Sequence, residues 1–198
     1  MADMGFQVMV VGNDELTHWC NSRGIQGFSF GSEAWKETFA TVREQITVRS
    51  QALKAAKEES GERHKEVSRG FQPIAVLIDD LDEYIRGYGE SDQDNVLFLR
   101  HMTADNDRIA TYRIYTFCAI GHRGYNEWKN KEPVFTMTKS KRGFMPGGRL
   151  GECDPFSVSF ELPTGQRNGP LPEGEAYVYL EDGIKQVVIP RNEPTEEN

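Results

Sequence analysis

The sequence has few cysteines, no long apolar run and no excess of positive charge. Its three cysteines, Cys20, Cys118 and Cys153, are widely spaced and include no CxxC pair. This excludes a disulfide framework or a zinc cluster as the basis of the fold. Unbroken apolar stretches extend over only about six residues, whereas a helix that spans a bilayer needs about 20. We therefore expect reduced thiols and no membrane helix.

The length, the first residues and the net charge of the chain further limit the kinds of protein that it can be. A chain of 198 residues suffices for one domain with a sizeable core, and two large domains are excluded. The first residues, MADMGFQVMVV, lack the basic start and long apolar core of a secretory signal, which predicts a cytosolic protein. The net charge of -8 would repel phosphates, so no general affinity for nucleic acid is expected.

Short apolar runs alternate with segments of helical periodicity in the first 121 residues. A long amphipathic helix is predicted to begin with Ser32 as its N-cap, to break at Gly61 and to stop at Gly70. A further helical segment contains Val96 and Met102. Strands are predicted at 7–11, 25–30, 74–78 and 112–120. Strands that alternate with helices in this way predict a parallel α/β sheet.

Proline and glycine punctuate the remainder of the chain, so loops should dominate there. The exception is a β-hairpin, predicted from EAYVYL and IKQVVI on either side of Asp182-Gly183, because Asp-Gly tolerates the positive φ angles of a tight turn. Residues 191–198 are acidic and predicted to be disordered.

The segment IAVLIDDLDEYI places Asp79 and Asp80 directly after an apolar strand. Ligands of parallel sheets bind at the carboxyl ends of the strands. In phosphate-binding α/β domains, the first acid at this place holds Mg²⁺ and the second orients the water that attacks the γ-phosphate. The alternative is that these aspartates only cap the helix that follows.

The partner motif of such a site is missing. No GxxxxGK[ST] occurs, and the glycine-rich stretch FMPGGRLGE at 144–152 has neither its spacing nor its Lys-Ser/Thr pair. Without a loop of backbone amides and its lysine, nucleotide binding loses its main source of energy. We therefore expect no hydrolysis by this chain alone.

Several segments together resemble a known family: REQITVRSQALKAAKEESG, PIAVLIDDLDEYI, TFCAIGH and LPEGEAYVYLEDGIKQVVIP. Their order is similar to that of the FtsK/SpoIIIE-type ATPases, and more narrowly to the last ATPase module of the type VII secretion coupling proteins (EssC/EccC). The resemblance implies a three-layer P-loop NTPase fold of the RecA/FtsK type. That fold would have a mainly parallel sheet, a C-terminal β-hairpin and a degenerate or missing Walker A motif, over a module spanning residues 1–190.

The resemblance also implies roles for single residues. Asp79 and Asp80 would be a Walker-B-like pair, catalytic or vestigial, with Asp79 as the Mg²⁺ ligand if nucleotide binds. The family usually has Asp-Glu here, and Gly121-His122 stands where a polar sensor side chain would follow the next strand. The aspartate at position 80 in place of glutamate and the Gly121-His122 pair both weaken the case for ATP hydrolysis. No tightly bound cofactor is expected in this chain, although ATP and Mg²⁺ would serve the parent assembly.

The function implied is that of a degenerate terminal module of a secretion motor, at the inner face of the membrane in the parent protein. It would act by recognising a secreted helical substrate or by regulating neighbouring ATPase modules, with oligomers of the parent as a further expectation. One alternative is a Mg²⁺-dependent ATPase subunit that uses Asp79 and Asp80 with a phosphate loop supplied from outside the chain. A second alternative is a fragment of a DNA translocase.

The first strand has two interpretations in such a fold. If residues 7–11 are the phosphate-loop strand with an eroded loop, they pair with 112–118. If they are the second strand, they pair with 74–78, and the module is N-terminally incomplete. The segment ELTHWCNSRGIQGFSF favours the second interpretation, whereas independent folding of the chain favours the first.

Basic residues gather between 122 and 149, where aromatic residues are interleaved with them. This pattern can bind single-stranded nucleic acid, but in an acidic protein an acidic protein partner or a neighbouring module is the better candidate. Alternatively, the lysines only keep an edge strand VFTMT soluble. The candidate partner-binding residues are Arg123, Lys129, Lys131, Lys139, Lys141 and Arg142.

Overall fold

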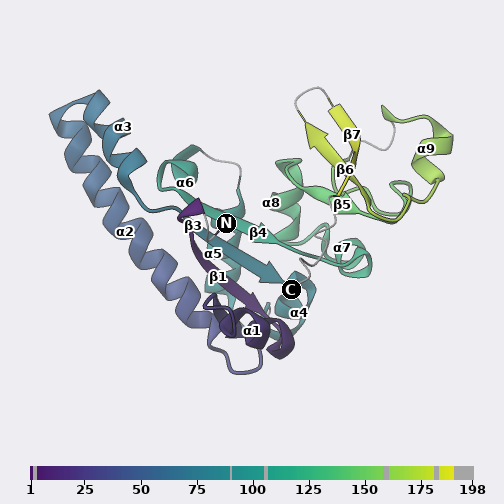
Figure 1. Ribbon diagram of the computed structural model, residues 1–198, viewed down its shortest axis with the longest axis horizontal. Helices are drawn as coiled ribbons and strands as arrows, with labels where there is room; N and C mark the ends of the chain where they lie inside the picture. Colours follow the sequence, from purple (N-terminus) through teal and green to yellow (C-terminus); the bar gives the residue numbers. More distant parts are fainter. Residues whose placement is uncertain (2–3, 90, 105–106, 158–160, 181–182, 190–198) are drawn as a thin grey trace, which may run out of the picture. The chain divides into compact units, whose positions relative to one another are not determined.

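The computed structural model describes residues 1, 4–89, 91–104, 107–157, 161–180 and 183–189 (Figure 1). The chain divides into two compact units, Met1–Gly121 and His122–Asn198, within the span that we expected to form one module. Among the described residues, no helix has the length and apolar character needed to cross a membrane. The predicted tail, 191–198, lies outside the described residues.

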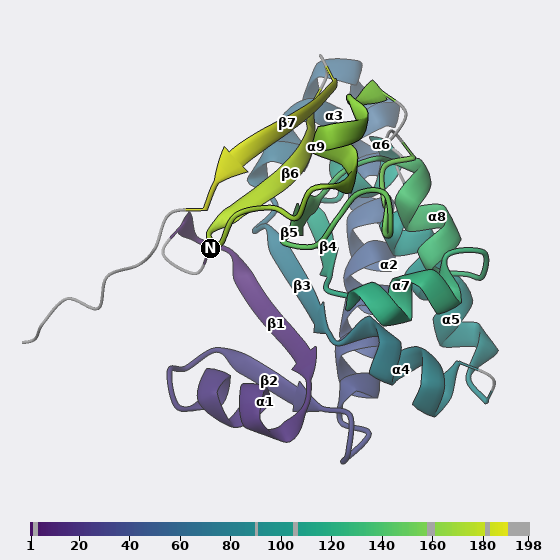
Figure 2. The ribbon, with the colours of Figure 1, turned by 90° about the vertical axis from the view of Figure 1, so that its right-hand side faces the viewer.

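The first unit contains a four-stranded sheet in which every pairing is parallel, as predicted. Its spatial order is β2-β1-β3-β4, and Figure 2 shows β1 beside β3. The strands are β1 (Gln7–Gly12), β2 (Gln26–Ser29), β3 (Ile74–Asp79) and β4 (Ile114–Cys118). β1 pairs with β3 over its whole length, from Gln7↔Ile74 to Gly12↔Asp79. This is the pairing with 74–78 that is predicted if residues 7–11 are the second strand. The alternative interpretation, in which 7–11 pair with 112–118, is wrong.

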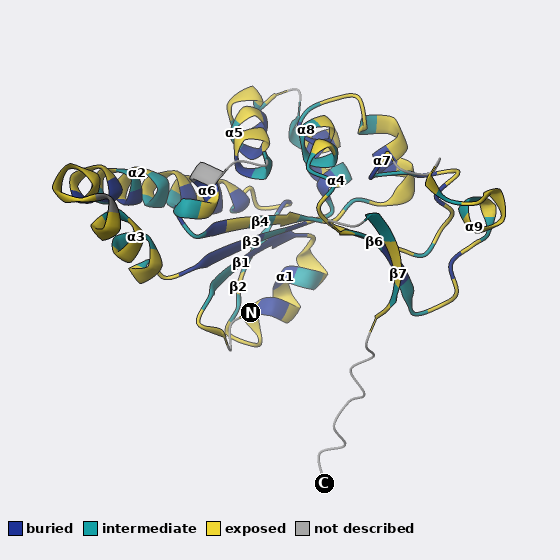
Figure 3. Cartoon of the chain, turned by 90° about the horizontal axis from the view of Figure 1, so that it is seen from above, coloured by how far each residue is buried: buried dark blue, intermediate teal, exposed yellow. Residues whose placement is uncertain are grey.

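Helices lie on both faces of this sheet and make three layers (Figure 3). Helix α1 (Asp14–Asn21) lies against β2, where a side chain on Gly27 would collide with the backbone of Thr17. Helices α2 (Trp35–Glu59) and α5 (Gln93–Thr103) cover the opposite face. The unit also contains α3 (Gly61–Gly70), α4 (Leu81–Tyr88) and α6 (Asp107–Thr111). Cover from two sides explains why residues 74–78 of β3 are all apolar.

An aromatic cluster joins α2 to α4. The Trp35 ring lies 5.2 Å from that of Tyr84 and 5.5 Å from that of Phe39, both edge to face. Helix α2 begins at Trp35, with Ala34 in the cap position and no side-chain cap, so the prediction of Ser32 as N-cap is wrong. The residues before the helix form a turn instead, in which the Glu33 N–H donates to the Phe30 carbonyl at 3.2 Å.

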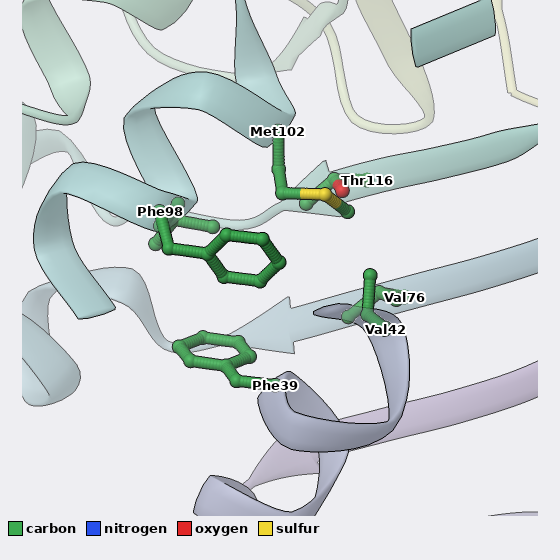
Figure 4. Close-up of a pocket in the computed structure, with 7 residues that line it drawn as sticks. Phe39, Val42, Val76, Phe98, Met102 and Thr116 are labelled. Carbon is green, nitrogen blue, oxygen red and sulfur yellow. The ribbon is translucent and has the colours of Figure 1, made fainter. Parts of the chain in front are cut away.

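Beneath α2 and α5 lies a small apolar pocket with no space for a water molecule (Figure 4). Side chains from both helices and from two strands line it: Phe39, Val42, Val76, Phe98, Leu99, Met102 and Thr116. The only polar atom among these side chains is Oγ1 of Thr116, which is buried and has no hydrogen-bond partner in the described structure. The pocket is therefore part of the core rather than a ligand site.

The second unit contains an antiparallel sheet of order β5-β6-β7, formed by β5 (Phe144–Pro146), β6 (Glu175–Leu180) and β7 (Gly183–Val188). The predicted hairpin is thus confirmed, with Gly183 at a φ of 108°, while Asp182 lies outside the described residues. The helices described in the second unit are α7 (His122–Trp128), α8 (Val134–Lys139) and α9 (Thr164–Asn168). The edge strand considered for VFTMT is wrong: it is α8, which begins after Pro133, a residue suited to helix starts.

Candidate functional site

Asp79 and Asp80 stand at the carboxyl end of β3, an inner strand of the parallel sheet. Their two side chains have different environments. Asp79 is exposed, and its carboxylate has no hydrogen-bond or ion-pair partner in the described part of the chain. Asp80 is half-buried and is the N-cap of α4, where its Oδ1 accepts a hydrogen bond of 2.8 Å from the Asp82 N–H. The capping interpretation thus holds for Asp80 and leaves Asp79 free.

Burial is the main influence on the charge of Asp80. It raises the pKa of this carboxyl above its usual value, and the negative charges of Asp82 and Asp79 act in the same direction. The hydrogen bond from the Asp82 N–H and the nearby Arg86 partly oppose this rise. The folded protein therefore penalises the ionised form of Asp80, the form that a metal ligand or a general base needs.

The end of β1 lies close against the same part of β3. Gly12 is paired with Asp79, and a Cβ atom on Gly12 would lie 2.5 Å from the Asp79 carbonyl oxygen. On the other side, the Ala119 N–H donates to Ile78 at 2.8 Å, and the Ala119 carbonyl accepts from the Leu81 N–H at 2.9 Å. The three strand ends are thereby held in register around the acidic pair.

The carboxyl ends of β1 and β3 are also the topological switch point of the sheet. The chain goes from β1 to β2 on one side and then crosses to β3 on the other side of β1. Three polar residues at the ends of β1 and β2 were missed from sequence. Asn13 caps α1 by accepting from the Leu16 N–H at 2.9 Å, and Asp14 accepts a hydrogen bond from the Ser29 hydroxyl. The signal was Gly12-Asn13-Asp14, a polar turn directly after a buried strand.

Metal binding at this edge has little support from the geometry. Within the described ranges, no group of three or more His, Cys, Asp or Glu residues is arranged to hold a metal ion. Of the predicted pair, only Asp79 has a carboxylate free to accept one. It would supply one or two oxygen ligands, so a Mg²⁺ ion here would depend on waters and on the phosphates of a nucleotide.

Gly121 and His122, the proposed sensor position, lie at a boundary in the chain. Gly121 is the last residue of the first unit, and the exposed His122 begins α7 in the second. The first unit therefore does not itself bring an imidazole to the end of β4.

The predicted basic residues belong to the second unit, where several are engaged locally. The ammonium groups of three lysines lie over aromatic rings: Lys131 over Trp128 at 4.8 Å, Lys139 over Phe135 at 3.9 Å and Lys141 over Tyr179 at 4.7 Å. Lys129 lies 3.4 Å from the Asn126 side-chain oxygen, and Arg142 also has an interaction partner. Arg123 is exposed. Rings covered by the protein's own lysines are poor platforms for stacking bases.

Comparison with known proteins adds no relative to these observations: no model of a protein family, no curated protein and no solved structure matches the chain.

Proposed function

We propose that the chain is a module of the FtsK/SpoIIIE type from a protein-export motor, and that it acts by binding other proteins rather than by hydrolysing ATP. The resemblance to the terminal module of type VII secretion coupling proteins supplies the biological context. The observation that supports this best is the pairing of β1 with β3, with the acidic pair at the carboxyl end of β3. This is the arrangement expected if residues 7–11 are a second strand.

Two observations favour a module without turnover. The sequence has no GxxxxGK[ST] loop to hold phosphates. In addition, the resemblance makes Asp80 the counterpart of the catalytic acid, but its carboxylate caps α4 and its pKa is raised by burial. An acid held in this way is poorly suited to orient an attacking water, so recognition of a secreted helical protein or of a neighbouring module remains as the role.

A Mg²⁺-dependent ATPase with its phosphate loop supplied from outside the chain is the second candidate. Asp79 favours it, because the resemblance makes this residue the metal ligand and its carboxylate has no partner among the described residues. A role in DNA translocation has less support, since the net charge is -8 and three of the basic residues cover aromatic rings.

Titration calorimetry with ATP, with and without MgCl₂, separates the first two candidates. We expect no Mg²⁺-dependent binding by the purified chain at micromolar nucleotide. Micromolar binding that needs Mg²⁺, is lost in Asp79→Ala and persists in Glu44→Ala, which removes an exposed acid from α2, would refute the proposal in favour of the ATPase. Fluorescence anisotropy with labelled DNA tests the third candidate, for which a steep fall in affinity between 50 and 200 mM salt would be the signature, by the release of counterions.

A further inference from the structure

A cleft of about 330 Å³ opens between α2, α3 and the end of α6, all in the first unit. Figure 1 shows α3 folded back beside the end of α2. Thr111 and Tyr112 line the cleft and directly precede β4, so it lies toward the amino ends of the parallel strands. The acidic pair lies at their carboxyl ends, so the cleft is a separate site. The lining residues are Leu53, Lys54, Lys57, His64, Thr111 and Tyr112.

Three basic side chains line this cleft. Lys54 and Lys57 are exposed and lie one turn apart on α2, and His64 of α3 is half-buried. None of these side chains has a hydrogen-bond or ion-pair partner in the described part of the chain. The described lining contains no acidic residue, and the acidic residues nearest in sequence lie outside it: Glu58, Glu59 and Glu62. In a chain with a net charge of -8, these basic groups remain without acidic partners.

A buried arginine adds positive charge behind the cleft. Arg49 is 5% exposed, and its Nη1 donates a hydrogen bond of 2.6 Å to the carbonyl of Tyr112 in the cleft wall. Arg113 donates to the carbonyls of Arg69 at 2.7 Å and of Phe71 at 3.0 Å. These carbonyls satisfy N–H groups but do not neutralise charge, and burial and the charge of Arg113 both lower the pKa of Arg49. Because charges interact more strongly near a protein interior than in water, Arg49 strengthens the attraction of an anion to the cleft.

We propose that this cleft binds an acidic segment of a partner protein, which rests on the protein-binding role proposed above and specifies the chemistry of the partner. Lys54 and Lys57 would hold its carboxylates, and an apolar side chain would contact Leu53 and Tyr112, which are almost fully buried and form the floor. Two lysines one turn apart are separate point charges and suit carboxylates spaced along a peptide. A phosphate is more often held by backbone amides or by the fork of an arginine. The aromatic residue of the described lining, Tyr112, is 4% exposed and offers no open ring for a base to stack on.

Fluorescence anisotropy on the full chain tests the inference, with a short labelled peptide in which glutamates flank a single leucine as the probe. We expect micromolar binding that weakens as the salt concentration is raised. The double variant Lys54→Gln with Lys57→Gln should bind about tenfold more weakly, because an exposed ion pair is worth up to about fivefold in affinity. Lys65→Gln removes an exposed lysine of α3 outside the cleft and should bind as the wild type does. Since the three lysines are exposed, both proteins should keep the wild-type circular dichroism.

Changes in the probe test the two parts of the proposed ligand. Replacing the glutamates of the peptide by glutamines should abolish binding, and replacing its leucine by glycine should weaken it. Equal affinities of the wild type and the double variant would overturn the inference, as would an equal loss in Lys65→Gln or tight binding of the glutamine peptide. Inorganic phosphate or single-stranded DNA that displaces the labelled peptide at lower concentration than the unlabelled peptide does would assign the cleft to a phosphate ligand instead.

The titration with ATP keeps this inference distinguishable from the proposed function, because it concerns the other end of the sheet. If neither the peptide nor Mg²⁺ with ATP binds, the acidic-segment inference alone is overturned. If Mg²⁺-dependent binding of ATP is found and is lost in Asp79→Ala, the proposed function is overturned, whether or not the peptide binds.

Discussion

The half-buried Asp80 allows the capping role of this residue to be separated from the effect of its charge. Asparagine caps a helix about as well as aspartate, whereas alanine does not cap at all. Both substitutions remove the carboxylate. Asp80→Ala should therefore be less stable than Asp80→Asn by about 1 kcal/mol, the usual value of an N-cap, at every pH at which the chain is folded.

The comparison of Asp80→Asn with the wild type isolates the charge. Because the folded-state pKa is raised, folding favours the protonated carboxyl, and the wild type loses stability as the pH rises from the usual 3.8 through the folded value. The asparagine variant does not titrate at this position. The two proteins should therefore be nearly equal in stability near pH 3, and Asp80→Asn should be the more stable one at pH 7.

Urea unfolding at pH 3 to 7 provides the measurement, followed by tryptophan fluorescence in a Trp128→Phe background, so that the signal comes from Trp19 and Trp35 of the first unit. Equal stabilities of the alanine and asparagine variants would show that the hydrogen bond to the Asp82 N–H contributes nothing. A wild type more stable than Asp80→Asn at pH 7 would show that the fold favours the ionised carboxylate, and the physical argument against a catalytic Asp80 would then fail.

Two further substitutions test the packing around the sheet. Thr116→Val replaces a buried hydroxyl that has no hydrogen-bond partner by a methyl group of similar size and should stabilise the protein by about 1–2 kcal/mol in urea unfolding; a loss of stability would reveal a partner for this hydroxyl. Gly12→Ala places a Cβ atom 2.5 Å from the Asp79 carbonyl oxygen and should destabilise by about 1–3 kcal/mol, whereas Gly121→Ala, with nothing within 4 Å, should be nearly neutral; similar midpoints for the two would contradict this close approach.

Much of the first unit could be predicted because its sequence signals are local. The apolar runs that became β1 and β3 are bounded by polar turns, and the break at Gly61 separates α2 from α3 as expected. The prediction of Ser32 as the N-cap was wrong because α2 begins at Trp35. The ring of Trp35 packs against that of Tyr84, which is distant in the sequence, so this start depends on a contact that local sequence signals do not show. A capping preference is worth about 1 kcal/mol and gives way to such packing.

The second unit was harder to predict because its patterns are short. VFTMT fits a strand by β propensity, yet the segment forms the six-residue helix α8 directly after Pro133. The sequence pattern suggests that Lys139 is an edge charge or a partner contact, but its ammonium group lies over the ring of Phe135, one helical turn away. That spacing of four residues brings the two side chains together only on a helix, so the error in secondary structure also concealed the contact.

The acidic pair shows how one sequence signal can satisfy two functional interpretations at once. An aspartate after a buried strand is expected both at a phosphate site and at the start of the next helix, and the sequence presents two of them in succession. The fold divides the roles: Asp80 caps the first turn of α4, and Asp79, at the switch point, has a carboxylate without a partner in the described part of the chain. If nucleotide chemistry survives at this edge, Asp79 must carry it, which makes Asp79→Ala the variant that discriminates binding and Asp80→Asn the one that discriminates stability.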